Sequence, residues 1–305
     1  MHGELRFDGR VAVVTGAGRG IGRAYARLLA ARGAQVVVND LGGSIKGEGA
    51  DESVAAVVVR EIVDAGGVAI ADGHDIATER GAQALIDAAV DRFGRLDALI
   101  NNAGIVRWAG FPQLDEATLA AHLSVHVMGS FHTTRAAWPQ MAEQQYGRVV
   151  MTTSTGLFGL PTNGAYATAK AAVVGLTRSL KLAGEPLNIL VNLIAPGAAT
   201  RMGGAPESAD MAPELVAPMA AFLAHEQCPV SGEIYTAGFG RFARLFIAST
   251  DGWVRPPREG APTIEDVVAH WTEINDEAGY FVPDDLMSWS ETFMAHLHDE
   301  STDRS

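Results

Sequence analysis

The chain has 305 residues and a formal net charge of −13 at pH 7; 48% of its residues are hydrophobic and 19% are charged. This composition is typical of a water-soluble globular protein with one large domain and an appendage. The acidic balance argues against nucleic acid or an anionic membrane surface as a partner. The longest apolar runs are only strand-sized, such as Val36–Val38, so no membrane-spanning helix is predicted. Residues 1–10 lack the apolar core of a secretory signal, so export is not predicted either.

Two scarce residue types carry information. The single cysteine, Cys228, allows no disulfide within the chain and indicates a reducing, cytoplasmic compartment. Lysine occurs only as Lys46, Lys170 and Lys181, while arginine is plentiful. A lysine that falls inside a motif of this chain is therefore less easily explained as background.

Up to about residue 240, short β-branched runs alternate with Ala-rich helical patterns. Strands are predicted at Val11–Thr15, Gln35–Asn39, Val68–Ala71, Ala98–Asn101, Arg148–Thr153, Ile189–Ile194 and Glu233–Thr236. Helices are predicted at Ile21–Arg32, Ser53–Ala65, Gly81–Phe93, Glu116–Ala142, Tyr166–Ala183 and Glu214–Leu223. This alternation predicts an α/β fold: a doubly wound, Rossmann-like parallel sheet of about seven strands with helices on both faces. Such sheets bind ligands beyond the carboxyl ends of their strands.

The pattern changes after Gly240, so we divide the chain into a domain over residues 1–240 and an extension over 241–305. Trp253–Pro262 holds three prolines and is predicted to be a stiff connector. Two amphipathic helices are predicted beyond it, over Thr263–Ile274 and Pro283–Leu297. We expect this helical extension to pack on the core or on a partner subunit.

A glycine-rich loop predicts a dinucleotide site. The first strand runs into Thr15–Gly22 (TGAGRGIG), and a helix follows at once. Glycines there permit a tight turn and let a pyrophosphate approach the N–H groups of the helix N-terminus. The residues predicted to contact the cofactor in this loop are Gly16, Arg19, Gly20, Ile21 and Gly22.

A carboxylate at the end of the second strand indicates which dinucleotide is bound. Asp40 can accept hydrogen bonds from both ribose hydroxyls of NAD and would repel the 2′-phosphate of NADP. Arg19 could meet such a phosphate, but Asp40 is expected to lie closer to the ribose, so NAD is predicted. Asp75 and Ile76 follow the third strand, where an adenine edge would lie. Asn102, Ala103 and Gly104 follow the fourth strand, where small residues let the chain pass close to the cofactor.

Tyr166 and Lys170 are four residues apart on a predicted helix and therefore share one face. A neighbouring ammonium favours the phenolate, by on the order of 4 kcal/mol at about 4 Å before desolvation. Tyr166 could then exchange a proton with an alcohol oxygen while hydride moves to or from the cofactor. Ser154, after the fifth strand, would hydrogen-bond the substrate oxygen and orient it.

No other chemistry is indicated. The chain holds no HExxH, no Cys/His ligand cluster and no GxSxG elbow. His122 and His126 share a helical face, but no carboxylate or cysteine stands at ligand spacing, so no metal site is predicted.

Together these motifs resemble the short-chain dehydrogenase/reductase family over about residues 5–240. They are the loop Thr15–Gly22, the NNAG run Asn101–Gly104, Ser154 ahead of YATAK (Tyr166–Lys170), and Pro196–Gly197 before Thr200. The resemblance implies that Tyr166, Lys170, Pro196, Gly197 and Thr200 also contact the cofactor.

Four stretches resemble more closely the dehydrogenase unit of peroxisomal multifunctional enzymes of type 2. They are GRAYARLLAARGAQVVVNDLGG, VHVMGSFHTTRAAW, YGRVVMTTS and IAPGAATRM. Units of that kind are (3R)-hydroxyacyl-CoA dehydrogenases, also known as 17β-hydroxysteroid dehydrogenase type 4. The chain shows neither a hydratase nor a sterol-carrier domain, so the resemblance implies a bacterial, cytoplasmic relative with a single activity.

Two positions depart from the family pattern. Most members carry an Asn that helps hold the catalytic lysine through a water; His126 stands there, so its imidazole or backbone carbonyl would have to serve. Ser154 precedes Tyr166 by one residue fewer than usual, which puts Thr153 in the expected register. We assign the role to Ser154 by assuming a deletion in the loop Gly156–Gly164, and Thr153 and Thr155 stay open as alternatives.

The resulting hypothesis is an NAD-dependent dehydrogenase of a 3-hydroxyacyl-CoA or a 17β-hydroxysteroid. A 3-oxoacyl-acyl-carrier-protein ketoreductase is the alternative within the enzymes, and a non-catalytic dinucleotide sensor is the alternative outside them. The loop Arg201–Pro213 has the small, polar composition of a substrate lid. A homodimer or homotetramer is expected, formed through the helices Glu116–Ala142 and Tyr166–Ala183.

Overall fold

The computed structural model of the protein describes residues 3–199 and 208–299. The chain divides between Arg244 and Leu245 into two compact units, each described here by itself. Within the described ranges, no helix is both long enough and apolar enough to cross a bilayer.

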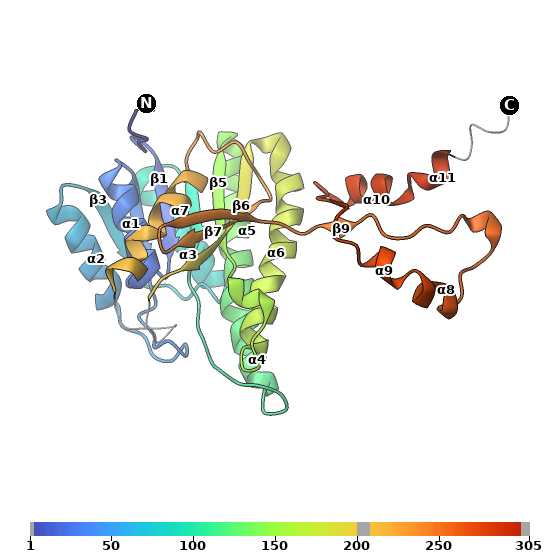
Figure 1. The fold of residues 1–305 in the computed structure, drawn as a ribbon. Helices are drawn as coiled ribbons and strands as arrows, with labels where there is room; N and C mark the ends of the chain where they lie inside the picture. The colour runs from blue at the N-terminus through green and yellow to red at the C-terminus, as the bar shows by residue number, and fades with distance from the viewer. Residues whose placement is uncertain (1–2, 200–207, 300–305) are drawn as a thin grey trace. The chain divides into compact units, whose positions relative to one another are not determined.

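An eight-stranded sheet forms the centre of the first unit, with the strand order β3-β2-β1-β4-β5-β6-β7-β8 (Figure 1). Its strands are β1 (Val11–Thr15), β2 (Gln35–Asn39), β3 (Val68–Asp72), β4 (Ala98–Asn101), β5 (Gly147–Thr152), β6 (Ile189–Gly197), β7 (Ile234–Gly238) and β8 (Arg241–Leu245). From β3 to β7, neighbouring strands pair in parallel. The order reverses between β1 and β4, and the crevice beyond their carboxyl ends is where doubly wound sheets bind ligands.

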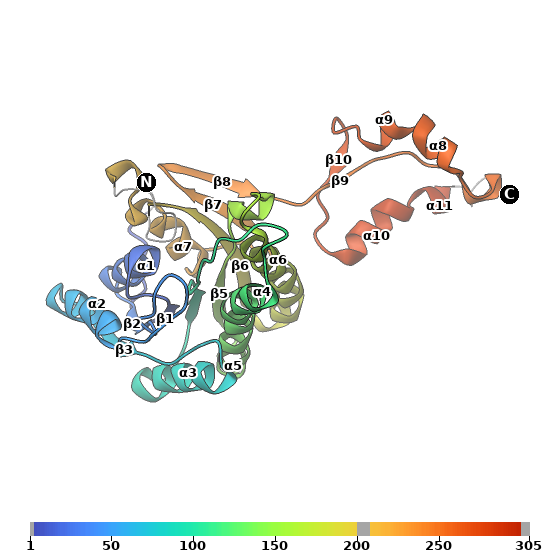
Figure 2. The same ribbon diagram turned by 90° about the horizontal axis from the view of Figure 1, so that it is seen from below.

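Helices cover both faces of this sheet. They are α1 (Gly20–Ala31), α2 (Ser53–Asp64), α3 (Glu79–Phe93), α5 (Gly129–Gln144), α6 (Gly164–Gly184) and α7 (Ala217–Leu223). On one face α1 packs between α2 and α7, and on the other α3 packs against α5 (Figure 2). The predicted fold class, a doubly wound α/β sheet, is confirmed.

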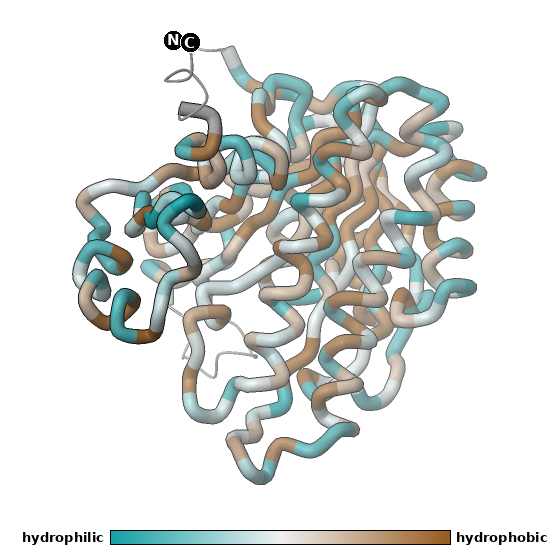
Figure 3. Tube along the Cα trace, turned by 90° about the vertical axis from the view of Figure 1, so that its right-hand side faces the viewer, coloured by the Kyte–Doolittle hydropathy of each residue, from teal (hydrophilic) through white to brown (hydrophobic). Residues whose placement is uncertain are grey.

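The packing of the core explains why the strand sequences are continuous apolar runs and do not alternate between apolar and polar residues. Because helices cover both faces, every residue of β1 and of β5 is buried. Hydrophobic segments accordingly gather along the central strands in Figure 3. Leu29 of α1 and Met151 of β5 are completely buried, and truncating either to alanine would cost about 2–5 kcal/mol of stability.

The predicted helix Glu116–Ala142 is not one regular α-helix. It consists of α4 (Glu116–His122), a π-helical turn η1 (Leu123–Met128) and α5. One wide turn leaves the spacing of apolar residues along the helix nearly unchanged, so the sequence pattern does not reveal the π-helical turn. Such turns are frequent at functional sites, and this one carries His126.

Strand β8 was not predicted. Gly238 at the end of β7 and Phe239 and Gly240 in the following turn all have positive φ. The sequence around these two glycines predicts the end of regular structure and not a link between paired strands. The Thr236 hydroxyl on β7 donates to the Ala243 carbonyl on β8 (3.3 Å). The predicted boundary at residue 240 therefore falls before the last strand of the sheet.

In the second unit the two predicted helices are each divided. The first consists of α8 (Ile264–Ala269) and α9 (Trp271–Ile274), and the second of α10 (Leu286–Met294) and α11 (His296–Asp299). The break between α8 and α9 is at His270, whose ring stacks on Trp253 at 4.2 Å between centroids. Two short antiparallel strands, β9 (Ser249–Thr250) and β10 (Tyr280–Phe281), complete the unit.

Candidate active site

The turn from β1 into α1 is shaped by close backbone contacts. Gly16 has φ +61° and Gly20 has φ +52°, a region that favours glycine. A Cβ on Gly16 would lie 2.8 Å from the Ala103 Cα, and one on Gly22 would lie 2.3 Å from the Gly16 carbonyl oxygen. At the N-cap, Arg19 makes no side-chain capping bond, so the first N–H groups of α1 remain available to an anion. This cradle fits the pyrophosphate of a dinucleotide.

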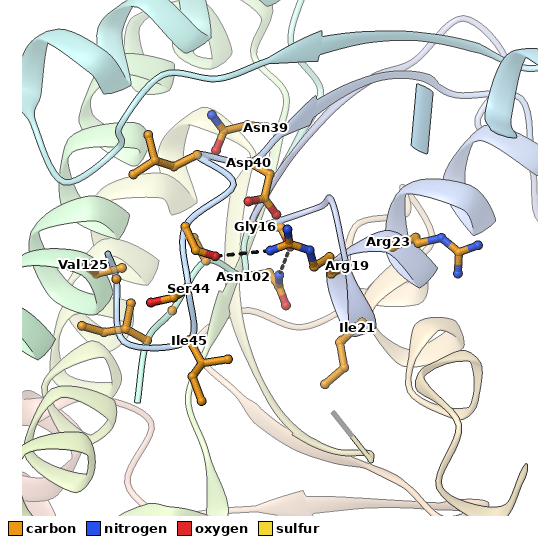
Figure 4. Close-up of a pocket in the computed structure, with 18 of the residues that line it drawn as sticks. Gly16, Arg19, Ile21, Arg23, Asn39, Asp40, Ser44, Ile45, Asn102 and Val125 are labelled. Atoms are coloured by element: carbon orange, nitrogen blue, oxygen red, sulfur yellow. Dashed lines mark hydrogen bonds between the residues drawn. The ribbon is translucent and has the colours of Figure 1, made fainter. Parts of the chain in front are cut away.

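The Asp40 carboxylate is held in place by backbone N–H groups. One oxygen accepts from Gly18 N (2.9 Å) and the other from Gly42 N (2.7 Å). The Arg19 guanidinium donates to the Gly43 carbonyl (3.2 Å). Figure 4 shows Asp40 and Arg19 in the same part of the cavity, so the carboxylate and the cation that bear on cofactor choice lie in one place.

A cavity of about 950 Å³ opens beyond the ends of the first four strands. Its lining includes these predicted cofactor residues: Gly16, Arg19, Gly20, Ile21, Gly22, Asp40, Asp75, Ile76, Asn102, Ala103 and Gly104. Tyr166, Lys170, Pro196 and Gly197 are not among its lining residues. Thr200 and the first part of the predicted lid, residues 201–207, lie outside the described residues.

Asn102 shapes the cavity through its backbone contacts. Its side-chain amide donates to the carbonyls of Thr15 (3.0 Å) and Gly16 (3.1 Å), and its backbone N–H donates to the Thr15 hydroxyl (3.0 Å). The amide thus fastens the end of β4 to the glycine turn. Asp75 accepts from Ala77 N (2.9 Å), and Ile76 is buried beside it.

The sequence did not point to one wall of the cavity, the segment Leu41–Asp51 after β2. The Asp51 N–H closes this segment by donating to the Leu41 carbonyl (2.9 Å). Ser44 and Ile45 of this segment line the cavity (Figure 4). The signal was available in its four glycines, of which Gly42 has φ +80° and would place a Cβ 2.2 Å from the Asp51 carbonyl oxygen.

Beyond β5, the three candidates for the substrate-orienting hydroxyl differ in their surroundings, and the third, Thr155, is exposed. Thr153 is completely buried, and its hydroxyl donates to the Lys170 carbonyl (2.7 Å). Ser154 is partly exposed and accepts from Gly156 N (3.0 Å). A Cβ on Gly156 would lie 3.1 Å from the Tyr166 ring and 3.2 Å from Ser154 Oγ, so serine and tyrosine flank the same glycine.

Tyr166 and Lys170 lie on α6 near the end of β5. The Lys170 ammonium is buried and donates to the Thr152 carbonyl (2.9 Å), and it lies 5.7 Å from the centre of the Tyr166 ring. Burial lowers the pKa of Lys170 to about 7. Burial also raises the pKa of Tyr166, and a hydrogen bond with Ser154 opposes that rise. Burial thus favours the neutral form of both groups.

His126 stands where the family pattern has Asn, but its Nε2 and its backbone carbonyl are engaged elsewhere. Its Nε2 lies 2.8 Å from the Ile105 carbonyl, and its backbone carbonyl accepts from Ser130 Oγ (2.8 Å). Lys170 is held by the Thr152 carbonyl instead. Among the described residues, no group of His, Cys, Asp and Glu is arranged to hold a metal ion.

Residues 10–209 match the family model described as short chain dehydrogenase. A protein named as a short-chain type dehydrogenase/reductase of Mycobacterium tuberculosis is 45% identical over 275 residues, which cover 88% of this chain and 95% of that protein. Peroxisomal multifunctional enzyme type 2 of Drosophila melanogaster is 43% identical over 280 residues, 90% of this chain and 46% of the enzyme. The chain thus spans less than half of that enzyme.

Solved structures give the same picture. The full-length Drosophila multifunctional enzyme superposes with a TM-score of 0.80 and 32% identity, covering 97% of this chain and 50% of that one. A 7α-hydroxysteroid dehydrogenase complexed with NADH and 7-oxo glycochenodeoxycholic acid superposes with a TM-score of 0.70 and 31% identity, covering 79% of this chain and 98% of that one.

Proposed function

Since the chain is an oxidoreductase of the short-chain dehydrogenase family, as its motifs predict, we propose that it uses NAD to interconvert a secondary alcohol and a ketone. The proposed substrate is a 3-hydroxyacyl-CoA or a 17β-hydroxysteroid, converted in the cytoplasm. The observation that carries the proposal is the placement of Tyr166, Ser154 and Lys170 at the same edge of the sheet as the cavity that contains Asp40.

In the proposed reaction Tyr166 exchanges the proton of the substrate hydroxyl. During oxidation its oxygen takes that proton, and during reduction it returns it to the carbonyl oxygen. Ser154 donates to the same substrate oxygen and fixes its direction toward Tyr166. Lys170, held by the Thr152 carbonyl, supplies a buried amine one helical turn from the phenol, and its ammonium form would stabilise the phenolate.

The residues proposed to hold the cofactor are the glycine turn with the N-terminus of α1 for the pyrophosphate, and Asp40 for the adenosine ribose. Bound NAD would supply the hydride acceptor. The 7α-hydroxysteroid dehydrogenase complexed with NADH supports both this cofactor and a steroid-like substrate. The resemblance to multifunctional enzymes of type 2 supports an acyl-CoA.

A 3-oxoacyl-acyl-carrier-protein ketoreductase is the second candidate, because Arg19 lines the cavity beside Asp40 and reductases in biosynthesis usually draw on NADP(H). Asp40 disfavours that cofactor through repulsion of its 2′-phosphate. A non-catalytic sensor is disfavoured by the hydroxyl and amine groups gathered near Tyr166, since a sensor needs no proton exchange.

Cofactor choice is the first prediction. NAD⁺ should give a kcat/KM at least about tenfold higher than NADP⁺, on the order of 1.4 kcal/mol, because Asp40 meets the ribose. Initial rates with both cofactors measure this ratio. Asp40→Asn is the isosteric control. It removes the negative charge and keeps the side-chain volume, so the ratio of kcat/KM with NAD⁺ to kcat/KM with NADP⁺ should fall. Equal efficiency of the wild type with both cofactors would show that Arg19 outweighs Asp40.

A substrate panel tests the proposal as a whole. NAD⁺ reduction is followed with 3-hydroxyacyl-CoA esters of several chain lengths, with the acyl-carrier-protein thioester and with 17β-hydroxysteroids. Turnover of an acyl-CoA or a steroid with NAD⁺ is expected. Turnover confined to the carrier-protein thioester with NADP(H) would favour the second candidate, and turnover of none of these substrates would contradict both.

The second unit is proposed to dock on its own core or on a partner subunit of a homodimer or homotetramer. Val268, Trp271, Leu286 and Met287 are 60–72% exposed, and burying each would be worth roughly 1.5–3 kcal/mol. Deletion of residues 256–305 should therefore change the number of subunits in the particle or raise KM for the best substrate. Light scattering and kinetics measure both, and circular dichroism checks that the sheet stays folded. An unchanged number of subunits together with an unchanged KM would show that the segment contributes neither to assembly nor to substrate binding.

A further inference from the structure

Two buried histidines lie against the ring of Tyr166. His122 is 0% and His126 is 2% exposed. Their imidazoles stack at 5.8 Å between centroids, 13° from parallel. The Tyr166 ring meets both edge-on, at 6.3 Å from His122 and 5.5 Å from His126. The π-helical turn η1 begins directly after His122 and carries His126, so both rings reach the space between α6 and the segment that follows β4.

The hydrogen bonds of His122 fix its protonation state. Its Nδ1 lies 2.8 Å from the Thr118 carbonyl, which can only accept, so Nδ1 carries a proton. The backbone N–H of Arg107 donates to Nε2 at 3.2 Å, so Nε2 carries none. His122 is thus a neutral imidazole with its proton on Nδ1.

His126 has the opposite arrangement. Its Nε2 lies 2.8 Å from the Ile105 carbonyl and 3.2 Å from the Ile105 N–H. The carbonyl, which can only accept, is the nearer partner, so Nε2 carries the proton and donates to it. Its Nδ1 is buried and has no hydrogen-bond partner; a proton there would be a buried donor without an acceptor. The ring lies so close to Gly104 that a Cβ on that glycine would be 2.5 Å from the imidazole Cε1. The glycine of the NNAG motif thus makes room for His126.

The segment that these histidines hold is a wall of the cavity. Ile105 and Arg107 line it. The same segment also holds the loop after β2, because Val106 N donates to the Ile45 carbonyl and Arg107 Nε to the Lys46 carbonyl, both at 2.8 Å. A continuous series of contacts therefore runs from Tyr166 through the two imidazoles to both loops that enclose this side of the cavity.

We propose that His122 and His126 are positioning residues which, as neutral imidazoles of opposite tautomer, fix the cavity wall Ile105–Arg107 relative to the phenol of Tyr166. This inference rests on the proposed function, because it assigns Tyr166 to proton exchange and the cavity to the dinucleotide. Neither histidine touches the reacting atoms; both act through the residues that they hold.

Burial, with the surrounding cations adding to it, keeps both rings neutral. The charged groups that face the pair are Arg107, from the segment after β4, and Lys170, from α6, and both are cationic; the phenol of Tyr166 also faces them. Burial, with these cations adding to it, lowers the pKa of His122, and burial and Lys170 lower that of His126 much further. Protonation of His122 therefore begins below the ordinary histidine value of about 6.5, and it removes the acceptor of the Arg107 N–H.

Matched substitutions at each histidine test the proposal by kinetics. His122→Gln keeps an acceptor near the Nε2 position and His126→Gln keeps a donor there, whereas His122→Leu and His126→Leu keep volume only. The Gln variants should retain kcat/KM within about threefold. The Leu variants should lose about tenfold or more, with a raised KM for the dinucleotide, because a buried polar group of the wall is left unpaired. Equal kinetics of the Leu and Gln variants would overturn the proposal.

The pH profile in the direction of ketone reduction separates positioning from bulk packing. Tyr166 must be protonated in that direction, so its own titration limits only the alkaline side. The wild type should lose kcat/KM on acidification as His122 protonates, and His122→Gln should not. An acid limb that stays unchanged in His122→Gln would contradict the proposal.

A readout without turnover comes from the tautomers themselves. Long-range ¹⁵N–¹H correlation spectra of the full chain labelled with ¹⁵N-histidine, assigned through the Gln variants, should show His122 as the Nδ1–H and His126 as the Nε2–H form at neutral pH. A charged or inverted ring would overturn the proposal, even if the Leu variants fail to fold. Correct tautomers in a wild type that turns over no alcohol or ketone would instead contradict the proposed function.

Discussion

Substitution of Tyr166 by phenylalanine is expected to lower kcat by at least about 10²-fold in both directions, because the phenol is the one group proposed to exchange the substrate proton. Phenylalanine keeps the ring that packs edge-on against His122 and His126, so the fold and the cavity should be preserved. Dinucleotide affinity should therefore stay close to that of the wild type. Steady-state kinetics give kcat, and quenching of protein fluorescence by NADH gives the dissociation constant.

The control for this substitution is Tyr235→Phe, which removes a phenol from β7, away from the residues proposed to react. It should leave kcat close to that of the wild type. If Tyr166→Phe keeps activity within a few fold of wild type, Tyr166 has no part in proton exchange.

Ser154→Ala and Thr153→Val should separate catalysis from stability. Ser154→Ala is expected to lower kcat by about 10²-fold, because the substrate oxygen loses an oriented donor. Thr153→Val should leave kcat within a few fold but reduce the free energy of unfolding by roughly 1–3 kcal/mol, because the Lys170 carbonyl loses its buried donor.

Kinetics and denaturant unfolding of both variants, measured in parallel, decide between the hydroxyls of Ser154 and Thr153. A large loss of kcat in Thr153→Val with little loss in Ser154→Ala would mean that the register of the loop Gly156–Gly164 is wrong. The substrate would then be oriented by the threonine.

Features that depend on local sequence composition were predictable from the sequence. Strand positions followed from apolar runs bounded by turn residues, because a sheet covered on both faces buries every position, as in β1 and β5. The glycine turn was readable for a similar reason. Gly16 and Gly22 have contacts that no side chain could tolerate, so their identity reports the geometry directly.

Features that depend on tertiary contacts were not predictable. The π-helical turn η1 adds little to the helical periodicity, and its effect appears only where His122 and His126 meet the segment after β4. The pKa of Lys170 depends on complete burial, which the spacing of Tyr166 and Lys170 cannot give. Strand β8 follows a turn whose Phe239 has a positive φ, a conformation that aromatic residues rarely adopt.

The central claim, that this chain moves hydride between a nicotinamide and a carbinol carbon with Tyr166 exchanging the proton, is tested most directly by isotope transfer. The protein is incubated with its best ketone substrate and with NADH in which both hydrogens of the nicotinamide C4 are deuterium, and the alcohol formed is analysed by mass spectrometry. We expect deuterium at the carbinol carbon in step with NADH oxidation, at a rate that falls by at least about 10²-fold in Tyr166→Phe. NADH oxidation without label at that carbon, or labelling at an undiminished rate in Tyr166→Phe, would contradict the account.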